Sequence, residues 1–279
     1  MFTLNCYGRL LVIRQPVVMG ILNATPDSFY AASRPSAESA ALMMVETMME
    51  EGATIVDIGG QSTAPGSIRV SEDEELQRVI GIIEAVHNRF PELILSVDTY
   101  YSNVARQAVQ AGAGIVNDIS AGTLDSNMLT TVGKLNVPYI AMHMRGTPQT
   151  MNTLAQYDNV TTDVLDYFIQ RMDDFKRAGI KDIIIDPGFG FAKTIAHNFE
   201  LLRNLDKFRI LQKPLLAGLS RKSTIYKTLG IKPDESLNGT TVLNTLALIN
   251  GASILRVHDV KPAMECVRLL MASGWIKAS

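Results

Sequence analysis

The chain has 279 residues, of which 47% are hydrophobic, and this length can bury a full-sized core. Its formal net charge of −2 excludes the strongly basic surface by which proteins bind nucleic acids or anionic membranes, so any anion must be bound by locally placed groups. No apolar run approaches the ~20 residues of a membrane-spanning helix, and the N-terminal stretch lacks the pattern of a signal peptide, so we expect a cytoplasmic protein.

The predicted elements begin with a β-hairpin over residues 2–13, where the sequence alternates around Tyr7 and Gly8. A buried strand follows at residues 17–23 and ends at Asn23, and a helical pattern comes after it. This order of strand, polar residue, loop and helix defines one βα unit. The same order recurs with predicted strands at residues 54–58, 93–97, 114–116, 137–142, 182–185, 214–219 and 253–255.

Helical patterns follow these strands. One opens at Ser71, with Glu74 three residues later, which is the signature of a capping box. The clearest begins at Val160, because apolar residues such as Phe168 and Phe175 recur at helical spacing. The other predicted helices are residues 36–51, 102–111, 127–135, 197–205, 221–229, 236–250 and 259–271.

Eight βα units follow one another without a change of composition or a low-complexity linker, so we expect a single domain over residues 1–279. The strands are continuously apolar, which is typical of a parallel sheet covered on both faces. Eight such units favour an α/β fold, the closed (β/α)₈ TIM barrel, with a short N-terminal β-hairpin. A doubly wound open sheet is the alternative.

Polar residues stand at the carboxyl ends of the predicted strands. They are Asn23, Asp57, Asp98, Asn117, His143, Asp186, Ser220 and Arg256. Such residues are common turn formers, but a carboxylate that directly ends an apolar run is costly unless it is paired. In a barrel these ends converge on one mouth, so we predict a functional site there. Its aspartates could bind a metal ion or pair with the edge of a nitrogen heterocycle.

A second pattern at the mouth predicts an anion site. Ser220 is the expected N-cap of the helix at residues 221–229, where free amides, the helix dipole and Lys222 would attract an anion. The stretch lacks the glycine spacing of a Walker A loop. Arg256 and His258, two residues apart, are placed to hold phosphate oxygens beside Asn23.

The sequence argues against covalent catalysis. Cys6 and Cys266 lie near opposite ends of the chain without metal-type spacing, so we expect reduced thiols. No serine, histidine and aspartate are spaced as a catalytic triad. Lys222 lies at the opening of a helix beside Arg221 and not inside a strand, which disfavours an aldolase that uses a Schiff base.

Seven motifs stand out along the chain. They are MGILNATPDSF (19–29), DIGGQSTAPG (57–66), SVDTY (96–100), NDIS (117–120), DPGFGFAK (186–193), GLSRKS (218–223) and RVHDV (256–260). In this order and spacing they resemble the dihydropteroate synthase family over nearly the whole chain. The resemblance implies a barrel that joins p-aminobenzoate to 6-hydroxymethyl-7,8-dihydropterin diphosphate, giving 7,8-dihydropteroate and diphosphate in folate synthesis. It also implies a homodimer and sensitivity to sulfonamides, which mimic p-aminobenzoate.

The resemblance further implies roles for residues at the mouth. Those that match the family's pterin-binding residues are Asp98, Asn117, Asp186 and Lys222. Among these, the expected catalytic residues are Asp98, Asp186 and Lys222. Asn23 matches a Mg²⁺ ligand, where the metal also holds the diphosphate, and Arg256 and His258 match the site of the leaving group. The residues that match the p-aminobenzoate site are Thr63, Pro65 and Ser220.

The chain departs from the family pattern in the second loop. The family usually reads Glu-Ser-Thr-Arg-Pro-Gly, whereas this chain has Gln61 and Ala64 in place of the glutamate and the arginine. The missing arginine normally helps to close the loop over the substrates and to offset anionic charge. Arg34 and Arg69 are the candidates to replace it. Smaller departures are residues 30–34, where Asp-Gly-Gly is common, and Ala192, where glycine is usual.

Two alternatives to a synthase stay open. A pterin-binding methyltransferase barrel shares the pocket of aspartates and asparagine, but it needs neither Asn23 as a metal ligand nor the pair of Arg256 and His258, and it works with a corrinoid partner domain. A catalytically weakened pterin-binding protein is favoured only by Ala64.

Overall fold

The computed structural model of the protein describes residues 1–24, 34–61, 67 and 69–277. Its strands are β1 (Phe2–Cys6), β2 (Arg9–Ile13), β3 (Val17–Asn23), β4 (Ile55–Gly59), β5 (Ile94–Asp98), β6 (Ile115–Asp118), β7 (Tyr139–Met142), β8 (Ile183–Asp186), β9 (Leu216–Ala217) and β10 (Ile254–Val257). Its α-helices are α1 (Arg34–Glu50), α2 (Glu72–Arg89), α3 (Ser102–Gln110), α4 (Met128–Leu135), α5 (Val160–Arg177), α6 (Ile195–Arg203), α7 (Ser223–Leu229), α8 (Leu237–Ile249) and α9 (Val260–Ala272). Short 3₁₀ turns are η1 (Met151–Leu154), η2 (Leu205–Leu211) and η3 (Pro233–Glu235).

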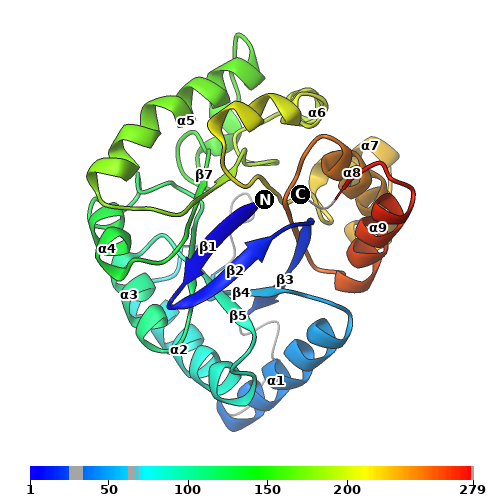
Figure 1. Cartoon of the computed structure of the whole chain (residues 1–279). Helices are drawn as coiled ribbons and strands as arrows, with labels where there is room; N and C mark the ends of the chain where they lie inside the picture. Colours follow the sequence, from blue (N-terminus) through cyan, green and yellow to red (C-terminus); the bar gives the residue numbers. More distant parts are fainter. Residues whose placement is uncertain (25–33, 62–66, 68, 278–279) are drawn as a thin grey trace.

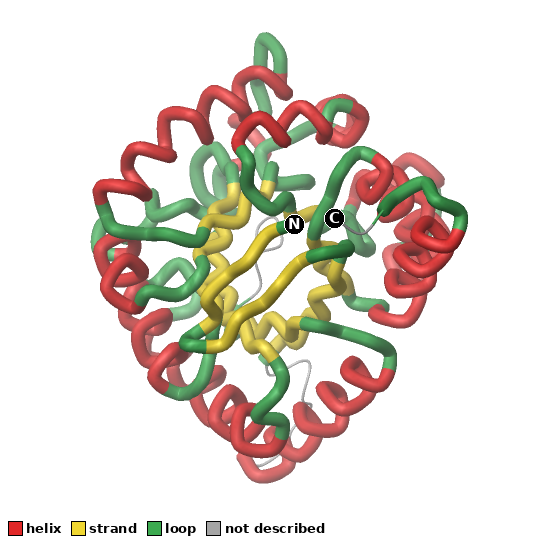
Figure 2. The backbone as a smooth tube through the Cα atoms, in the orientation of Figure 1, coloured by secondary structure: helices red, strands yellow, loops and turns green. Residues whose placement is uncertain are grey.

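Strands β3 to β10 form one parallel sheet in the order β8-β7-β6-β5-β4-β3-β10-β9. Ile185 of β8 bridges Leu215, just before β9, and the Ile185 amide donates to the Pro214 carbonyl at 2.9 Å. The sheet therefore closes on itself, and the helices surround it as a ring (Figures 1 and 2). The predicted (β/α)₈ barrel is confirmed. The doubly wound alternative is wrong, because in an open sheet the two edge strands β8 and β9 would not pair with each other.

The predicted hairpin is also confirmed. β1 and β2 pair antiparallel through a turn in which Tyr7 and Gly8 both have positive φ, 53° and 84°, as a two-residue hairpin turn requires. The hairpin crosses one end of the barrel (Figure 1), and its buried side chains, Leu4 and Leu11 among them, pack against residues near the starts of the barrel strands. The hairpin thus closes the amino-terminal end and leaves the carboxyl-terminal end for the site.

The barrel interior changes from apolar to polar along the strands. The hairpin rests on a layer made of Ile55, Ile94, Ile115, Ile140, Ile184, Leu216 and Ile254. Because side chains of a strand alternate between its faces, residues two positions further along point to the same interior. These residues are Asp57, Ser96, Asn117, Met142, Asp186, Gly218 and Arg256. A strand period of two therefore places several of the polar strand-end residues above a dry apolar layer.

The predicted helices and strands lie close to those observed, but the predicted capping box of α2 forms only in part. Ser71 does cap α2, since its hydroxyl accepts from the Glu74 amide at 3.3 Å. The reciprocal half of the capping box is absent, because the Glu74 carboxylate pairs with Arg78 one turn further along.

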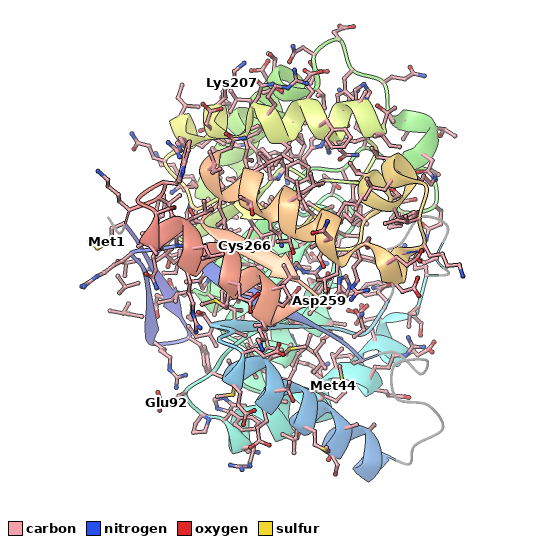
Figure 3. All side chains as sticks on the ribbon, turned by 90° about the vertical axis from the view of Figure 1, so that its right-hand side faces the viewer. Met1, Met44, Glu92, Lys207, Asp259 and Cys266 are labelled. Carbon is pink, nitrogen blue, oxygen red and sulfur yellow. The ribbon has the colours of Figure 1, made fainter. Side chains whose placement is uncertain are left out.

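Both cysteines are free thiols and are buried. Cys6 is the last residue of β1 in the hairpin, and Cys266 lies on α9, where Figure 3 labels it. Burial raises the pKa of the Cys6 thiol to about 12, so it is unreactive at neutral pH. In the described part of the chain, every helix is too short or too polar to cross a membrane.

Candidate active site

Arg256 joins two aspartates inside the mouth of the barrel. From β10, its Nε donates to Asp57 Oδ2 at 2.7 Å and its Nη2 donates to Asp98 Oδ2 at 2.6 Å. Asn117 Nδ2 donates to the same Asp57 oxygen at 2.8 Å. The structure thus brings together side chains from β4, β5, β6 and β10, although Asp57 and Arg256 lie 199 positions apart in the chain.

Asp57 is predicted to lie at the mouth with the other aspartates, but the family resemblance assigns it no individual role. It is fully buried, and its Oδ1 has no hydrogen-bond partner among the described residues. The signal for it is present in the sequence, since a carboxylate inside an apolar strand requires a partner. The partners of Asp57 are Arg256 and Asn117, which both donate to its Oδ2 and are positioned by it.

Charges in this network oppose one another. Burial raises the pKa of Asp98 to about 7, against the lowering effect of the Arg256 guanidinium. The carboxylates of Asp57, Asp118 and Asp186 add to the increase. Burial lowers the pKa of Arg256, but Asp57 and Asp98 outweigh this and hold it above its usual value. Arg256 therefore stays positive, while Asp98 exchanges a proton near neutral pH.

Asp186 and Lys222 are two further charged residues at the mouth, which attract each other without a direct ion pair. Asp186 Oδ1 accepts from the Gly188 amide at 2.8 Å. Lys222 Nζ donates to the Phe189 carbonyl and lies 4.9 Å from the centroid of the Phe191 ring. Burial raises the pKa of Asp186, against Lys222, and burial lowers the pKa of Lys222 to about 8, against Asp186. The charge of each group thus partly offsets the effect of burial on the pKa of the other.

Ser220 does not cap the helix after β9, so that prediction is wrong. Helix α7 begins only at Ser223, with Lys222 as its N-cap and no side-chain cap. The Ser220 hydroxyl lies 3.0 Å from His258 Nδ1 and accepts from the His258 amide at 3.2 Å. Desolvation lowers the pKa of His258 to about 4, and the charge of Arg256 adds to the decrease. His258 is therefore neutral at pH 7 and offers a ring N–H rather than a positive charge.

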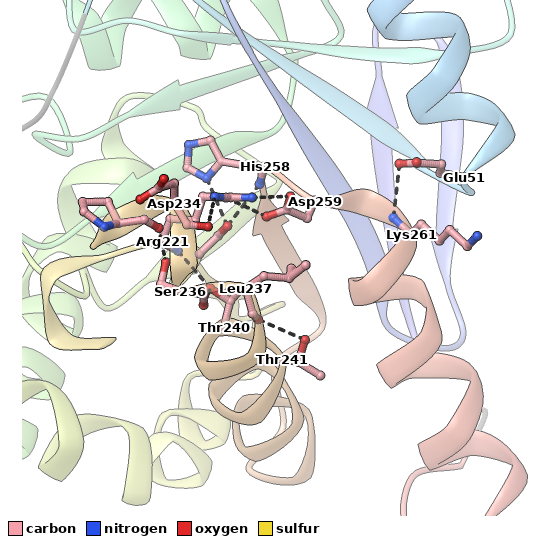
Figure 4. Close-up of polar contacts among 12 residues, drawn as sticks. Glu51, Arg221, Asp234, Ser236, Leu237, Thr240, Thr241, His258, Asp259 and Lys261 are labelled. Carbon is pink, nitrogen blue, oxygen red and sulfur yellow. Dashed lines mark hydrogen bonds and ion pairs between the residues drawn. The ribbon is translucent and has the colours of Figure 1, made fainter. Parts of the chain in front are cut away.

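Arg221 fixes the loops after β9 and β10 against each other (Figure 4). Its Nε and Nη2 each donate to one oxygen of Asp259 at 2.8 Å, and its amide donates to Thr240 Oγ1 at 3.1 Å. This paired geometry is typical of arginine with a carboxylate. The ion pair keeps Ser220 and His258 side by side at the mouth.

Asn23 ends β3 with an exposed side chain, in register with Gly59. In the described part of the chain, no three His, Cys, Asp or Glu side chains are grouped to hold a metal ion. Mg²⁺ retains several waters and commonly binds through one or two protein oxygens plus substrate phosphates. The donor set at Asn23 fits a Mg²⁺ of that kind. Thr63, Ala64 and Pro65 lie outside the described residues.

His143 is a strand-end residue that does not join the carboxylates of the mouth. Its ring packs against Tyr167, with ring centroids 4.8 Å apart, and against Tyr157 at 6.1 Å. Its Nδ1 lies 3.0 Å from Lys193 Nζ. Sequence reasoning assigns no contact to Lys193, because its partner His143 follows a different strand, β7.

Comparisons with known proteins agree with this geometry. Residues 19–258 match the family described as pterin binding enzyme. The dihydropteroate synthase of Haemophilus influenzae is 44% identical over 269 residues, which cover 96% of this chain and 97% of that one. The Xanthomonas albilineans dihydropteroate synthase with 4-aminobenzoic acid has a TM-score of 0.91 at 40% identity, covering 98% of each chain. Its structure with 7,8-dihydropteroate has a TM-score of 0.88 at 37% identity, covering 99% of this chain and 100% of that one. The chain therefore belongs to the dihydropteroate synthase family of pterin-binding enzymes.

Proposed function

We propose that this protein joins p-aminobenzoate to 6-hydroxymethyl-7,8-dihydropterin diphosphate and releases diphosphate, within one domain. The observation that carries the proposal is the set of acceptors inside the mouth, the carboxylates of Asp98 and Asp186 and the amide of Asn117. The 2-amino-4-oxo edge of a pterin presents N–H groups, which carboxylates and amide oxygens accept in pairs. A member of the family is solved with 7,8-dihydropteroate, which is the expected product.

Arg256 pairs with one of these acceptors, the carboxylate of Asp98. Its guanidinium offsets the buried charges of Asp98 and Asp57, of which Asp57 also accepts from Asn117. When a pterin N–H donates to Asp98 in place of Arg256, the Nη2 group of Arg256 is released. The freed N–H groups then face the diphosphate, because an arginine fork binds phosphate oxygens as well as carboxylates. Substrate binding and preparation of the leaving-group site are thereby the same event.

One bond breaks and one forms in the reaction. The C–O bond between the methylene carbon and the diphosphate breaks, and the methylene carbon bonds to the amine nitrogen. The reduced ring donates electrons to that carbon, so cleavage gives a delocalised cation that Asp98 and Asp186 stabilise. Lys222, held beside Asp186, binds the pterin from the other side. The aromatic amine is unprotonated at neutral pH, so it attacks without a strong base and loses its proton to water.

The departing diphosphate is stabilised by Arg256 and by the neutral ring N–H of His258. Asn23 would hold Mg²⁺ through its amide oxygen, and the metal when bound would neutralise charge on the diphosphate. On the p-aminobenzoate side, Ser220 is held by His258 near the mouth. Thr63 and Pro65 are proposed for that side from their motif alone.

The experiment that tests this function measures diphosphate release with and without p-aminobenzoate. Synthase activity requires release that depends on the amine. Pterin diphosphate that binds but releases nothing in the presence of the amine would leave a weakened pterin-binding protein. Methyl transfer to or from a corrinoid would indicate the methyltransferase instead.

We also propose that the protein is a homodimer through α7, α8 and α9. These neighbouring helices expose large apolar side chains, namely Leu229, Val242, Leu246 and Leu269. Burying them against a second copy would remove this apolar surface from water. Light scattering after size-exclusion chromatography should give twice the chain mass, and Val242→Asp should shift it towards the monomer. A monomeric wild-type protein would contradict the proposal.

A further inference from the structure

The Lys193 ammonium is surrounded by acceptors where the loop after β8 meets the end of β7. Its Nζ donates to the Gly188 and Phe191 carbonyls at 3.0 Å each and lies 3.4 Å from the His143 carbonyl. His143 Nδ1 lies 3.0 Å from the same nitrogen. Burial and the charges of Lys193 and Arg145 hold the pKa of His143 well below its usual value. The neutral ring therefore accepts from the lysine.

The loop that Lys193 holds, residues 187–192, has an energetically unfavourable backbone conformation. Gly188 has a φ of 74°, and a Cβ there would lie 2.0 Å from the His143 carbonyl oxygen. Ala192 has a φ of 49°, in the left-handed region that non-glycine residues rarely adopt. Such a conformation persists only where the surroundings enforce it. A single ammonium that binds carbonyls at both ends of the loop and at the strand beside it provides that restraint.

The same loop forms the wall against which Lys222 lies. The Phe189 carbonyl accepts from Lys222 Nζ, and the Phe191 ring lies beneath it at 4.9 Å. A Cβ on Gly190 would lie 3.2 Å from Lys222 Cδ, so a larger residue there would crowd the lysine side chain. The position of the Lys222 ammonium is therefore set by the loop, and the position of the loop is set by Lys193.

We propose that Lys193 is a positioning residue for pterin binding, which holds the 187–192 loop so that Lys222 meets the substrate; the proposal rests on the proposed function. Lys193 acts entirely through Lys222 and touches no reacting atom. The positive charge of Lys193 is essential to this positioning role. A neutral amine has two N–H groups for the acceptors around it, whereas the ammonium has three. Burial lowers the pKa of Lys193 to about 7, against Asp186, so the charged form is only just retained.

A double-mutant cycle tests this coupling. The variants are Lys193→Met, Lys222→Met and the double variant, with Lys207→Met on the exposed η2 turn as the control. The probe is the pterin diphosphate, and its dissociation constant is measured by titration calorimetry without p-aminobenzoate. Lys193→Met should weaken binding about tenfold in the wild-type background and less than about twofold in the Lys222→Met background. The KM for p-aminobenzoate should change little, and Lys207→Met should bind as wild type does.

Two results would overturn the proposal. An equal loss of affinity in both backgrounds would mean that Lys193 acts independently of Lys222. Unchanged affinity in Lys193→Met would mean that the loop keeps its position without the ammonium. If Lys193→Met is too unstable to purify, Lys193→Gln, which removes the charge but keeps a polar side chain with two N–H donors, is measured in both backgrounds with the same criterion. Failure of the proposed function is separate, since it appears as wild-type protein that binds the pterin but releases no diphosphate with the amine.

Discussion

The side-chain amide of Gln61 donates a hydrogen bond to the carboxylate of Glu75, and both side chains are buried. The amide oxygen of Gln61 accepts in turn from Tyr100 Oη at 2.8 Å. An amide both donates and accepts without charge, so it satisfies a carboxylate on one side and a hydroxyl on the other. Burial raises the pKa of Glu75 to about 7, and the charge of Asp98 adds to the increase. This arrangement explains how the chain accommodates glutamine where the family usually has glutamate.

Gln61→Glu should destabilise the protein, and more so at high pH. The folded pKa of Glu75, about 7, lies above its ordinary value of 4.5, so stability falls as the pH rises between these values. A second buried carboxyl would steepen the fall, because the two cannot both ionise side by side. We expect a loss of about 2 kcal/mol in unfolding free energy at pH 8 and a smaller loss at pH 6. Urea unfolding at both values measures it, with Gln170→Glu on the exposed face of α5 as the control. Equal losses at the two pH values would contradict this account.

Asp98→Asn should lower the turnover number about 100-fold, because the amide cannot offset the charge of the cation formed on C–O cleavage. The substitution leaves the shape of the side chain and a partner for Arg256. The measurement is amine-dependent diphosphate release at saturating substrates. Asp206→Asn in the exposed η2 turn is the matched control. Turnover of Asp98→Asn near that of the wild type would remove Asp98 from the mechanism.

The ratio kcat/KM for the pterin diphosphate should follow a bell-shaped pH profile. The ionised form of Asp98, with a pKa of about 7, and the protonated form of Lys222, with a pKa of about 8, are both required. Activity therefore rises as Asp98 ionises and falls as Lys193, with a pKa of about 7, and then Lys222 lose their protons. Lys222→Met should remove the fall at high pH from whatever activity remains. A flat wild-type profile from about pH 6 to 9 would contradict both assignments.

The sequence predicts the barrel and the ring of strand ends because both follow from local patterns. Asp98 and Asn117 stand where an apolar run stops, and a strand period of two then carries them into the interior. Ser220 shows where local rules fail. A serine before a helical pattern reads as an N-cap, but its observed partner is His258, 38 residues further along. Lys193 is missed for the same reason, since its acceptors exist only once the loop after β8 reaches the end of β7.

Asn23→Ala should raise the Mg²⁺ concentration needed for half-maximal activity about tenfold, because one protein oxygen is lost while the diphosphate and water ligands remain. The KM for p-aminobenzoate should stay within about twofold, since loss of a metal ligand affects the diphosphate side. Titration of activity with Mg²⁺ after treatment with a chelator measures both. Asn5→Ala in the hairpin, at the opposite end of the barrel, is the control. Equal Mg²⁺ requirements for Asn23→Ala and the wild type would exclude Asn23 as the ligand.

Ala64→Arg should lower the KM for p-aminobenzoate, because it restores the cation that the family usually carries in the second loop. One existing arginine lies close by in the chain. Arg69 lies against two adjacent rings, with its guanidinium carbon 5.1 Å from the Tyr100 centroid and 5.0 Å from that of Tyr101, and its Nε donates to Tyr101 Oη at 2.8 Å. If Arg69 already supplies the missing charge, Arg69→Met should raise the KM several-fold and Ala64→Arg should restore it in that background. The KM for p-aminobenzoate is measured in the wild type, both single variants and the double variant. A KM that Ala64→Arg leaves unchanged in both backgrounds would show that this chain binds its second substrate without a loop cation.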